Sequence, residues 1–154
     1  MMKLLYGAMV LACAPLAFAG NNEAYPSEKL AAFVAQQLDV TTLPAELRPK
    51  REKGKKTLEE YGYVTRDADD TEILVDAARG TSRFTLKILE RTSSGIYVCA
   101  RGQMPDASKA PFQRVLVLKR KDANGLLKSR ESGKEFQGCP ALGGAESSAD
   151  TSSY

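Results

Sequence analysis

The sequence predicts an α+β fold, in which an antiparallel sheet of about five or six strands carries short N-terminal helices on one face. Two observations lead to this prediction. Helical patterns occupy only the first part of the chain, whereas strand patterns dominate from residue 63 onward. Strands and helices do not alternate in the way that builds a parallel sheet. The 154 residues, 43% hydrophobic and 27% charged, suit one globular domain, which we expect over residues 27–142.

The first 19 residues have the pattern of a signal peptide. Lys3 supplies a positive charge, an apolar stretch follows over residues 4–16, and residues 17–19 form a small-residue cleavage motif. The apolar stretch is too short to span a bilayer, so we expect no transmembrane helix in the mature chain. We expect export to the periplasm or the exterior, removal of residues 1–19, and a loose leader over residues 20–26. Cys13 leaves a lipid-anchored form as an alternative, which Leu11 disfavours because lipidation signals prefer a small residue there.

Two cysteines, Cys99 and Cys139, remain after this cleavage, in a compartment that permits disulfides. We predict a structural bridge between them, which would contribute about 4 kcal/mol by the loop-closure argument. A reactive thiol is the alternative. Loss of Lys3 leaves 21 of the 22 basic residues against 19 acidic ones, and a net charge near +2 calls for no polyanionic partner.

Three short helical segments are expected before residue 63. Ser27 is placed to cap the first of them, whose apolar side chains recur at helical spacing: Leu30, Phe33, Val34 and Leu38. Residues 44–47 form a second candidate, with Pro44 in its first turn. Thr57 and Glu60 have capping-box spacing and predict a short helix over residues 58–61, which Gly62 ends.

A β-hairpin over residues 83–101 is the predicted centre of the sheet. Phe84, Leu86 and Ile88 alternate with polar residues, which points all three toward the helix-covered core. Residues 92–95 form the turn. In the second strand Cys99 falls on the side opposite Ile96 and Val98, so we expect the bridge to Cys139 on the other sheet face or at its edge.

The other predicted strands surround this hairpin. Strands are expected over residues 63–65 and 72–76, and over residues 112–121, where an apolar run at 115–118 indicates burial on both faces. Asn124-Gly125 predicts a tight primed turn before an antiparallel return over residues 126–130. We expect residues 143–154, which are rich in Gly, Ser and Ala, to form a disordered tail.

The composition argues against most catalytic chemistry. The chain has no His, the residue that most often serves as general base and metal ligand. We therefore expect a protein that is not an enzyme and that has no cofactor and no metal. The densest acidic cluster comprises Asp67, Asp69, Asp70, Glu72 and Asp76. Its spacing fails the EF-hand pattern, so we interpret it as a solvated turn between strands and keep a carboxylate-based hydrolase as an alternative.

A basic segment over residues 50–56 is the most distinctive surface feature. The candidate binding residues are Lys50, Arg51, Lys53, Lys55, Lys56, Tyr61 and Tyr63. Such a segment can bind an acidic protein or an anionic lipid or polymer of the envelope, and it can also be a plain solvated loop. No aromatic residues are interleaved with these cations, which disfavours nucleic acid as a partner.

These observations predict a small exported non-enzymatic binding protein. By analogy with compact, disulfide-stapled domains of this size, we expect an inhibitor or immunity-type partner of another exported protein. The alternative is an envelope-surface module that binds anionic lipid or polymer through the basic segment.

Overall fold

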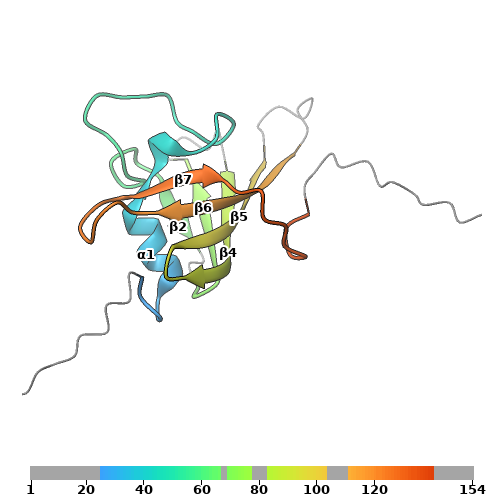
Figure 1. Ribbon diagram of the computed structural model, residues 1–154. Helices are drawn as coiled ribbons and strands as arrows, with labels where there is room; N and C mark the ends of the chain where they lie inside the picture. The colour runs from blue at the N-terminus through green and yellow to red at the C-terminus, as the bar shows by residue number, and fades with distance from the viewer. Residues whose placement is uncertain (1–24, 67–68, 78–82, 104–110, 141–154) are drawn as a thin grey trace, which may run out of the picture.

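The computed structural model describes residues 25–66, 69–77, 83–103 and 111–140 (Figure 1). The expected signal peptide and C-terminal tail lie outside these residues. In chain order the elements are α1 (Leu30–Gln37), β1 (Leu38–Asp39), the 3-10 turn η1 (Val40–Thr42), β2 (Val64–Arg66), β3 (Glu72–Asp76), β4 (Arg83–Thr92), β5 (Gly95–Gln103), β6 (Phe112–Lys119) and β7 (Leu127–Glu131). The strands form one curled sheet in the order β1-β7-β6-β5-β4-β3-β2.

The prediction of five or six antiparallel strands is wrong, because the sheet has seven strands and is mixed. The additional strand is β1, which pairs parallel to β7 through Leu38 opposite Leu127 and Asp39 opposite Lys128. Leu38 was expected to be the last apolar residue of the helix. Instead the chain becomes extended at Leu38, and the Asp39 side chain accepts a hydrogen bond from the Thr41 backbone N–H at 3.1 Å, which begins η1.

The number of helices was also overestimated, since α1 is the one α-helix among the described residues. Residues 44–47 form a single turn, in which the Pro44 carbonyl accepts from the Leu47 N–H at 2.9 Å. Ser27 does not cap α1. The helix begins after Lys29, which is left-handed (φ 52°) and makes no capping side-chain hydrogen bond.

The predicted capping box at residues 57–60 is confirmed, although it starts one turn and not a helix. Glu60 Oε2 accepts from the Thr57 N–H at 2.9 Å, and Thr57 Oγ1 accepts from the Glu60 N–H at 3.3 Å. Gly62, at φ 72°, ends the turn as expected, in a conformation that favours glycine.

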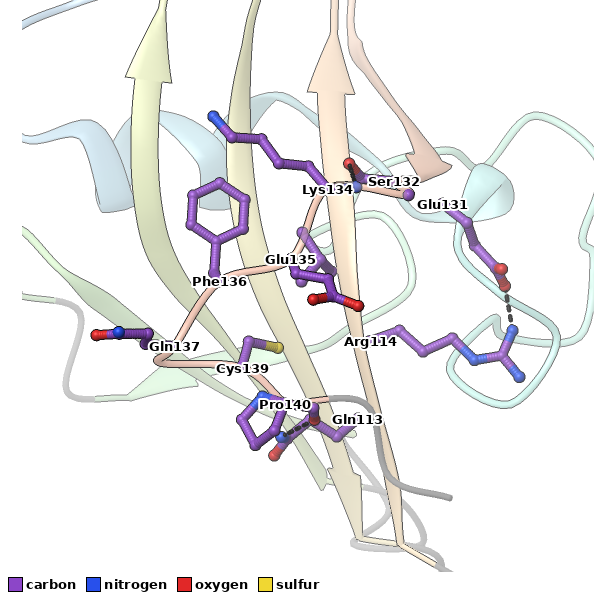
Figure 2. Close-up of a pocket in the computed structure, with 12 residues that line it drawn as sticks. Gln113, Arg114, Glu131, Ser132, Lys134, Glu135, Phe136, Gln137, Cys139 and Pro140 are labelled. Atoms are coloured by element: carbon purple, nitrogen blue, oxygen red, sulfur yellow. Dashed lines mark hydrogen bonds and ion pairs between the residues drawn. The ribbon is translucent and has the colours of Figure 1, made fainter. Parts of the chain in front are cut away.

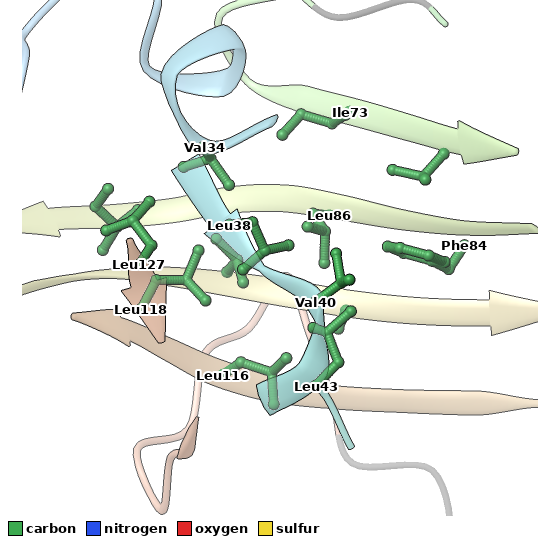
Figure 3. Packing of buried hydrophobic residues seen from close by; sticks show 14 of the residues in the cluster. Val34, Leu38, Val40, Leu43, Ile73, Phe84, Leu86, Leu116, Leu118 and Leu127 are labelled. Atoms are coloured by element: carbon green, nitrogen blue, oxygen red, sulfur yellow. The ribbon is translucent and has the colours of Figure 1, made fainter. Parts of the chain in front are cut away.

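The inner face of the sheet, which we define as the face that α1 covers, carries the main core (Figure 3). Ile96 and Val98 of β5 are fully buried there, as are Leu116 and Leu118 of β6. Val34 of α1 packs onto the same cluster. Burial of a side chain of this size contributes about 1.5–3 kcal/mol, so this face supplies most of the driving force for folding.

The central hairpin is confirmed and carries one irregularity. Phe84 and Leu86 are buried in the inner core, and Ile88 packs against it. A β-bulge follows Ile88 in the pairing of β4 with β5. Because the bulge adds a residue, Leu89 and Glu90 both lie on the opposite side of the sheet, where Leu89 packs near Cys99 and Glu90 pairs with Lys134.

The outer face, opposite α1, carries the disulfide. Cys99 and Cys139 are bonded at 2.03 Å, which confirms the predicted bridge and its position on the face opposite Ile96 and Val98. After β7, residues 132–140 run over β6 and β5 to reach Cys99; we call them the strap. Tyr97 and Phe136, with ring centroids 5.5 Å apart, pack beside the bridge in a second, small apolar cluster.

The expected primed turn after β6 is wrong. The Gly125 N–H donates to the Asp122 carbonyl at 3.2 Å, and the Asn124 N–H donates to Asp122 Oδ1 at 3.2 Å. Neither Asn124 nor Gly125 has the positive φ that a primed turn requires. The Asp122 side chain therefore shapes the turn, and the antiparallel return of β7 is confirmed.

Candidate functional site

The basic loop, residues 50–56, displays four of its five cations to solvent. Lys50, Arg51, Lys53 and Lys56 are exposed. Lys55 is partly buried: its Nζ lies 2.7 Å from Glu52 Oε2 and 5.8 Å from the centre of the Tyr61 ring. The loop therefore carries a positive surface of which one charge is neutralised within the loop itself.

Hydrogen bonds attach the basic loop to the body of the protein at both ends. The Tyr61 hydroxyl accepts from the Glu52 N–H at 3.0 Å. The Lys56 carbonyl accepts from the Val40 N–H at 2.8 Å, which joins the loop to η1. Directly after the loop, the Leu58 side chain is 2% exposed in the main core. The positions of the cations are thus fixed by the fold, although their side chains are free to turn.

The two tyrosines of the predicted site have mainly structural contacts. Tyr61 and Tyr63 are both partly buried against the main core. Tyr63 packs edge-to-face on Phe84, with ring centroids 6.0 Å apart. Tyr61 lies beside Lys55, so the structure brings it to the basic loop. Tyr63 instead packs on Phe84 of the main core.

The acidic segment before β3 is organised as a turn. Asp69 Oδ1 accepts hydrogen bonds from the backbone N–H groups of Thr71 and Glu72, both at 2.7 Å, and these bonds lower the pKa of the Asp69 carboxyl. Asp67 lies outside the described residues. Within the described parts of the chain, no group of three or more acidic or cysteine side chains is arranged to hold a metal ion.

Asp76 is the acidic residue of this cluster that the sheet buries. Its Oδ1 accepts from Arg83 Nε at 2.6 Å, and Arg66 Nε lies 2.9 Å from its Oδ2. Two arginines of neighbouring strands therefore share one carboxylate, which leaves an excess of positive charge at this part of the outer face.

A hollow of about 740 Å³ lies beside the strap, between it and β6 (Figure 2). Its two cations are already paired. Arg114 binds Glu131, and Lys134 binds Glu90 while its Nζ lies 4.8 Å from the centre of the Phe136 ring. The Lys134–Glu90 pair attaches the strap to β4, and the Arg114–Glu131 pair joins β6 to β7, so both cations are engaged.

A second hollow, of about 460 Å³, lies on the outer face across β3, β4, β5 and β6. Its polar lining includes Arg83, Arg101 and Gln113, none of which was expected to belong to a site. The alternation of β4 and β5 already places Arg83 and Arg101 on the outer face. The hollow itself depends on the pairing of distant strands, and the strap carbonyls of Gly138 and Pro140 hold two of its side chains; the sequence holds no local signal for either.

Comparison with known proteins gives no relative: no protein-family model, no curated protein and no solved structure matches the chain. Among the described residues, no helix has the length and apolar character needed to cross a membrane.

Proposed function

We propose that this protein is a small exported, non-enzymatic binding protein that holds another exported protein through its basic loop. The partner's surface is acidic, and an inhibitor or immunity-type role fits this mode of binding. The Cys99–Cys139 disulfide is compatible with an oxidising compartment outside the cytosol.

One observation carries this proposal: the basic loop is both exposed and fixed. Lys50, Arg51, Lys53 and Lys56 project from a backbone held by the Tyr61 hydroxyl and the Val40 N–H. A loop backbone that is already fixed loses little conformational entropy on binding, and it favours a partner whose carboxylates match the positions of the four cations. A lipid bilayer or a flexible polymer presents mobile charges, to which such a fixed pattern brings no comparable advantage.

The test uses a variant in which the four exposed cations are neutralised together, K50Q/R51Q/K53Q/K56Q. Lys55 is kept because it pairs with Glu52 within the loop. The matched control, K119Q/K121Q/K128Q/R130Q, removes four exposed charges from β6, β7 and the turn between them. Both variants have the same net charge, so nonspecific electrostatic effects are equal.

Each oxidised protein is immobilised and exposed to the exported fraction of its own source, and bound proteins are identified by mass spectrometry. We expect the wild-type protein and the control to recover the same stoichiometric partner, and the loop variant to recover at least fivefold less. The retained partner should elute as salt is raised, because salt screens exposed charges. Equal recovery by the loop variant and the control would contradict the proposal.

Vesicles containing anionic lipid form a second arm of the experiment. Loop-dependent binding to vesicles, without any stoichiometric protein partner, would replace the proposal with the envelope-surface alternative.

A further inference from the structure

The second hollow on the outer face contains a guanidinium group that has no counter-ion among the described residues. Four side-chain positions lie in one row across neighbouring strands: Leu74 is opposite Thr85, Thr85 opposite Arg101, and Arg101 opposite Gln113. All four line the hollow. Arg101 lies two residues from Cys99 on β5, which places the row on the face that carries the disulfide.

Arg101 has unused hydrogen-bonding capacity. Its Nη2 donates to the Gly138 carbonyl of the strap at 2.9 Å, a neutral acceptor. Its Nε is buried and has no acceptor, and no carboxylate of the described residues forms an ion pair with it. A buried donor without a partner is unfavourable, and a guanidinium has five N–H groups to satisfy.

Arg101 is the net positive charge of the hollow. Arg83, which also lines the hollow, shares the Asp76 carboxylate with Arg66, so these three residues retain one positive charge, which Glu72 in the same lining offsets. The hollow beside the strap differs in this respect, because Arg114 and Lys134 are each paired with a glutamate there. An incoming anion is therefore expected at the Arg101 hollow.

We propose that this hollow binds the carboxylate of a small organic acid or of a peptide C-terminus, with Arg101 as the main contact. A guanidinium pairs with a carboxylate through two parallel hydrogen bonds. Leu74 and Pro111 offer apolar surface to the rest of the ligand. Glu72, which also lines the hollow, repels negative charge more strongly when the ligand carries two charges, which selects a monocarboxylate over a doubly charged phosphate.

The strap sets the position of this site. Gly138, which holds Arg101, directly precedes Cys139, and the next residue, Pro140, accepts from Gln113 Nε2 at 2.6 Å (Figure 2). The disulfide thus fixes the two backbone carbonyls that orient two side chains of the lining. The site exists in this form only while the strap lies on the outer face.

The experiment is an NMR titration of the ¹⁵N-labelled, oxidised protein with three probes: N-acetyl-L-leucine as the monocarboxylate, N-acetyl-L-leucinamide as its uncharged match, and inorganic phosphate. We expect saturable shifts of the backbone amides of Leu74, Thr85, Arg101 and Gln113 with the carboxylate and none with the amide. Phosphate should bind at least tenfold more weakly.

Arg101→Gln should weaken carboxylate binding at least tenfold, because a charge-assisted hydrogen bond to a guanidinium is lost. Arg101→Lys keeps the charge but cannot form two parallel hydrogen bonds, so its carboxylate affinity should lie between those of the wild type and Arg101→Gln. Arg130→Gln, an exposed change on β7 outside the hollow, is the matched control and should leave the affinity unchanged. If Arg101→Gln does not give a folded spectrum, Arg83→Gln replaces it, and a smaller but measurable weakening is expected because Arg83 already shares the Asp76 carboxylate.

Three results would overturn the proposal: no saturable shift at these amides, equal binding of the amide probe, or an affinity that the Arg101 and Arg83 variants leave unchanged. Phosphate binding as tight as carboxylate binding would overturn the choice of a monocarboxylate.

Discussion

The disulfide offers the sharpest test of how this fold is stabilised. Replacing both cysteines, Cys99→Ala with Cys139→Ala, opens a loop between positions 40 residues apart. In the loop-closure model the cross-link lowers the entropy of the unfolded chain, and a loop of this length contributes about 4 kcal/mol to the free energy of unfolding. A domain of this size has a total stability of about 5–15 kcal/mol, so the double variant should remain folded but close to its limit.

Urea denaturation followed by circular dichroism measures this loss. The urea concentration at the unfolding midpoint should be lower for the variant. Its free energy of unfolding should also fall more steeply with urea concentration, because an unfolded chain without the cross-link exposes more surface. Cys139→Ala alone should cost as much as the double change, since either substitution removes the bridge. Reductant should move the wild-type transition to that of the variant. A loss below about 1 kcal/mol would refute the loop-closure argument.

Three further predictions concern single residues. Leu38→Ala should lower the free energy of unfolding, measured by urea denaturation, by about 2–5 kcal/mol because Leu38 is fully buried. Val64→Ala is the control and should change it by less than about 0.5 kcal/mol, because the Val64 side chain is 50% exposed. Gly62→Ala should reduce the melting temperature because its φ is 72°, and Gly133→Ala, at a glycine without positive φ and with open space around it, should not. Hydrogen bonds from the Thr57 and Lys56 backbone N–H groups lower the pKa of the Glu60 carboxyl in the folded state. The charged carboxylate therefore stabilises the folded protein above the unfolded pKa of about 4.3, and this stabilisation is lost as pH falls through the folded pKa. The difference in urea midpoint between wild type and Glu60→Gln should therefore shrink on acidification, and a difference independent of pH would contradict this assignment.

The parts of the fold that the sequence predicted are those that depend on local alternation. Phe84 and Leu86 alternate with polar residues, and this pattern alone orients β4. The position of Cys99 opposite Val98 follows from the same alternation, which is why the face of the disulfide was predictable. The capping box was predictable too, because Thr57 and Glu60 act on each other within one turn.

The parts that the sequence did not predict depend on distant partners. Strand β1 has two residues, and its extended form is stabilised by β7 and not by its own side chains. The basic loop was visible in the composition, but its attachment through the Tyr61 hydroxyl was not. Arg101 was not expected to belong to a site, because its buried Nε without an acceptor among the described residues becomes evident only when the strap and the neighbouring strands are in place.

The pairing of the first strand with the last has a consequence for the order in which the chain can fold. Thr42 and Ser129 are 87 positions apart, yet the Ser129 N–H donates to Thr42 Oγ1 at 2.8 Å and Ser129 Oγ donates to the Thr42 carbonyl at 2.7 Å. The segment after α1 therefore has to wait for β7, so this edge of the sheet can close only when nearly the whole chain is available. In chains cut before residue 127, the Thr42 hydroxyl and carbonyl lose both of these partners. This delay keeps the edge that β1 and β7 share open until β7 is available.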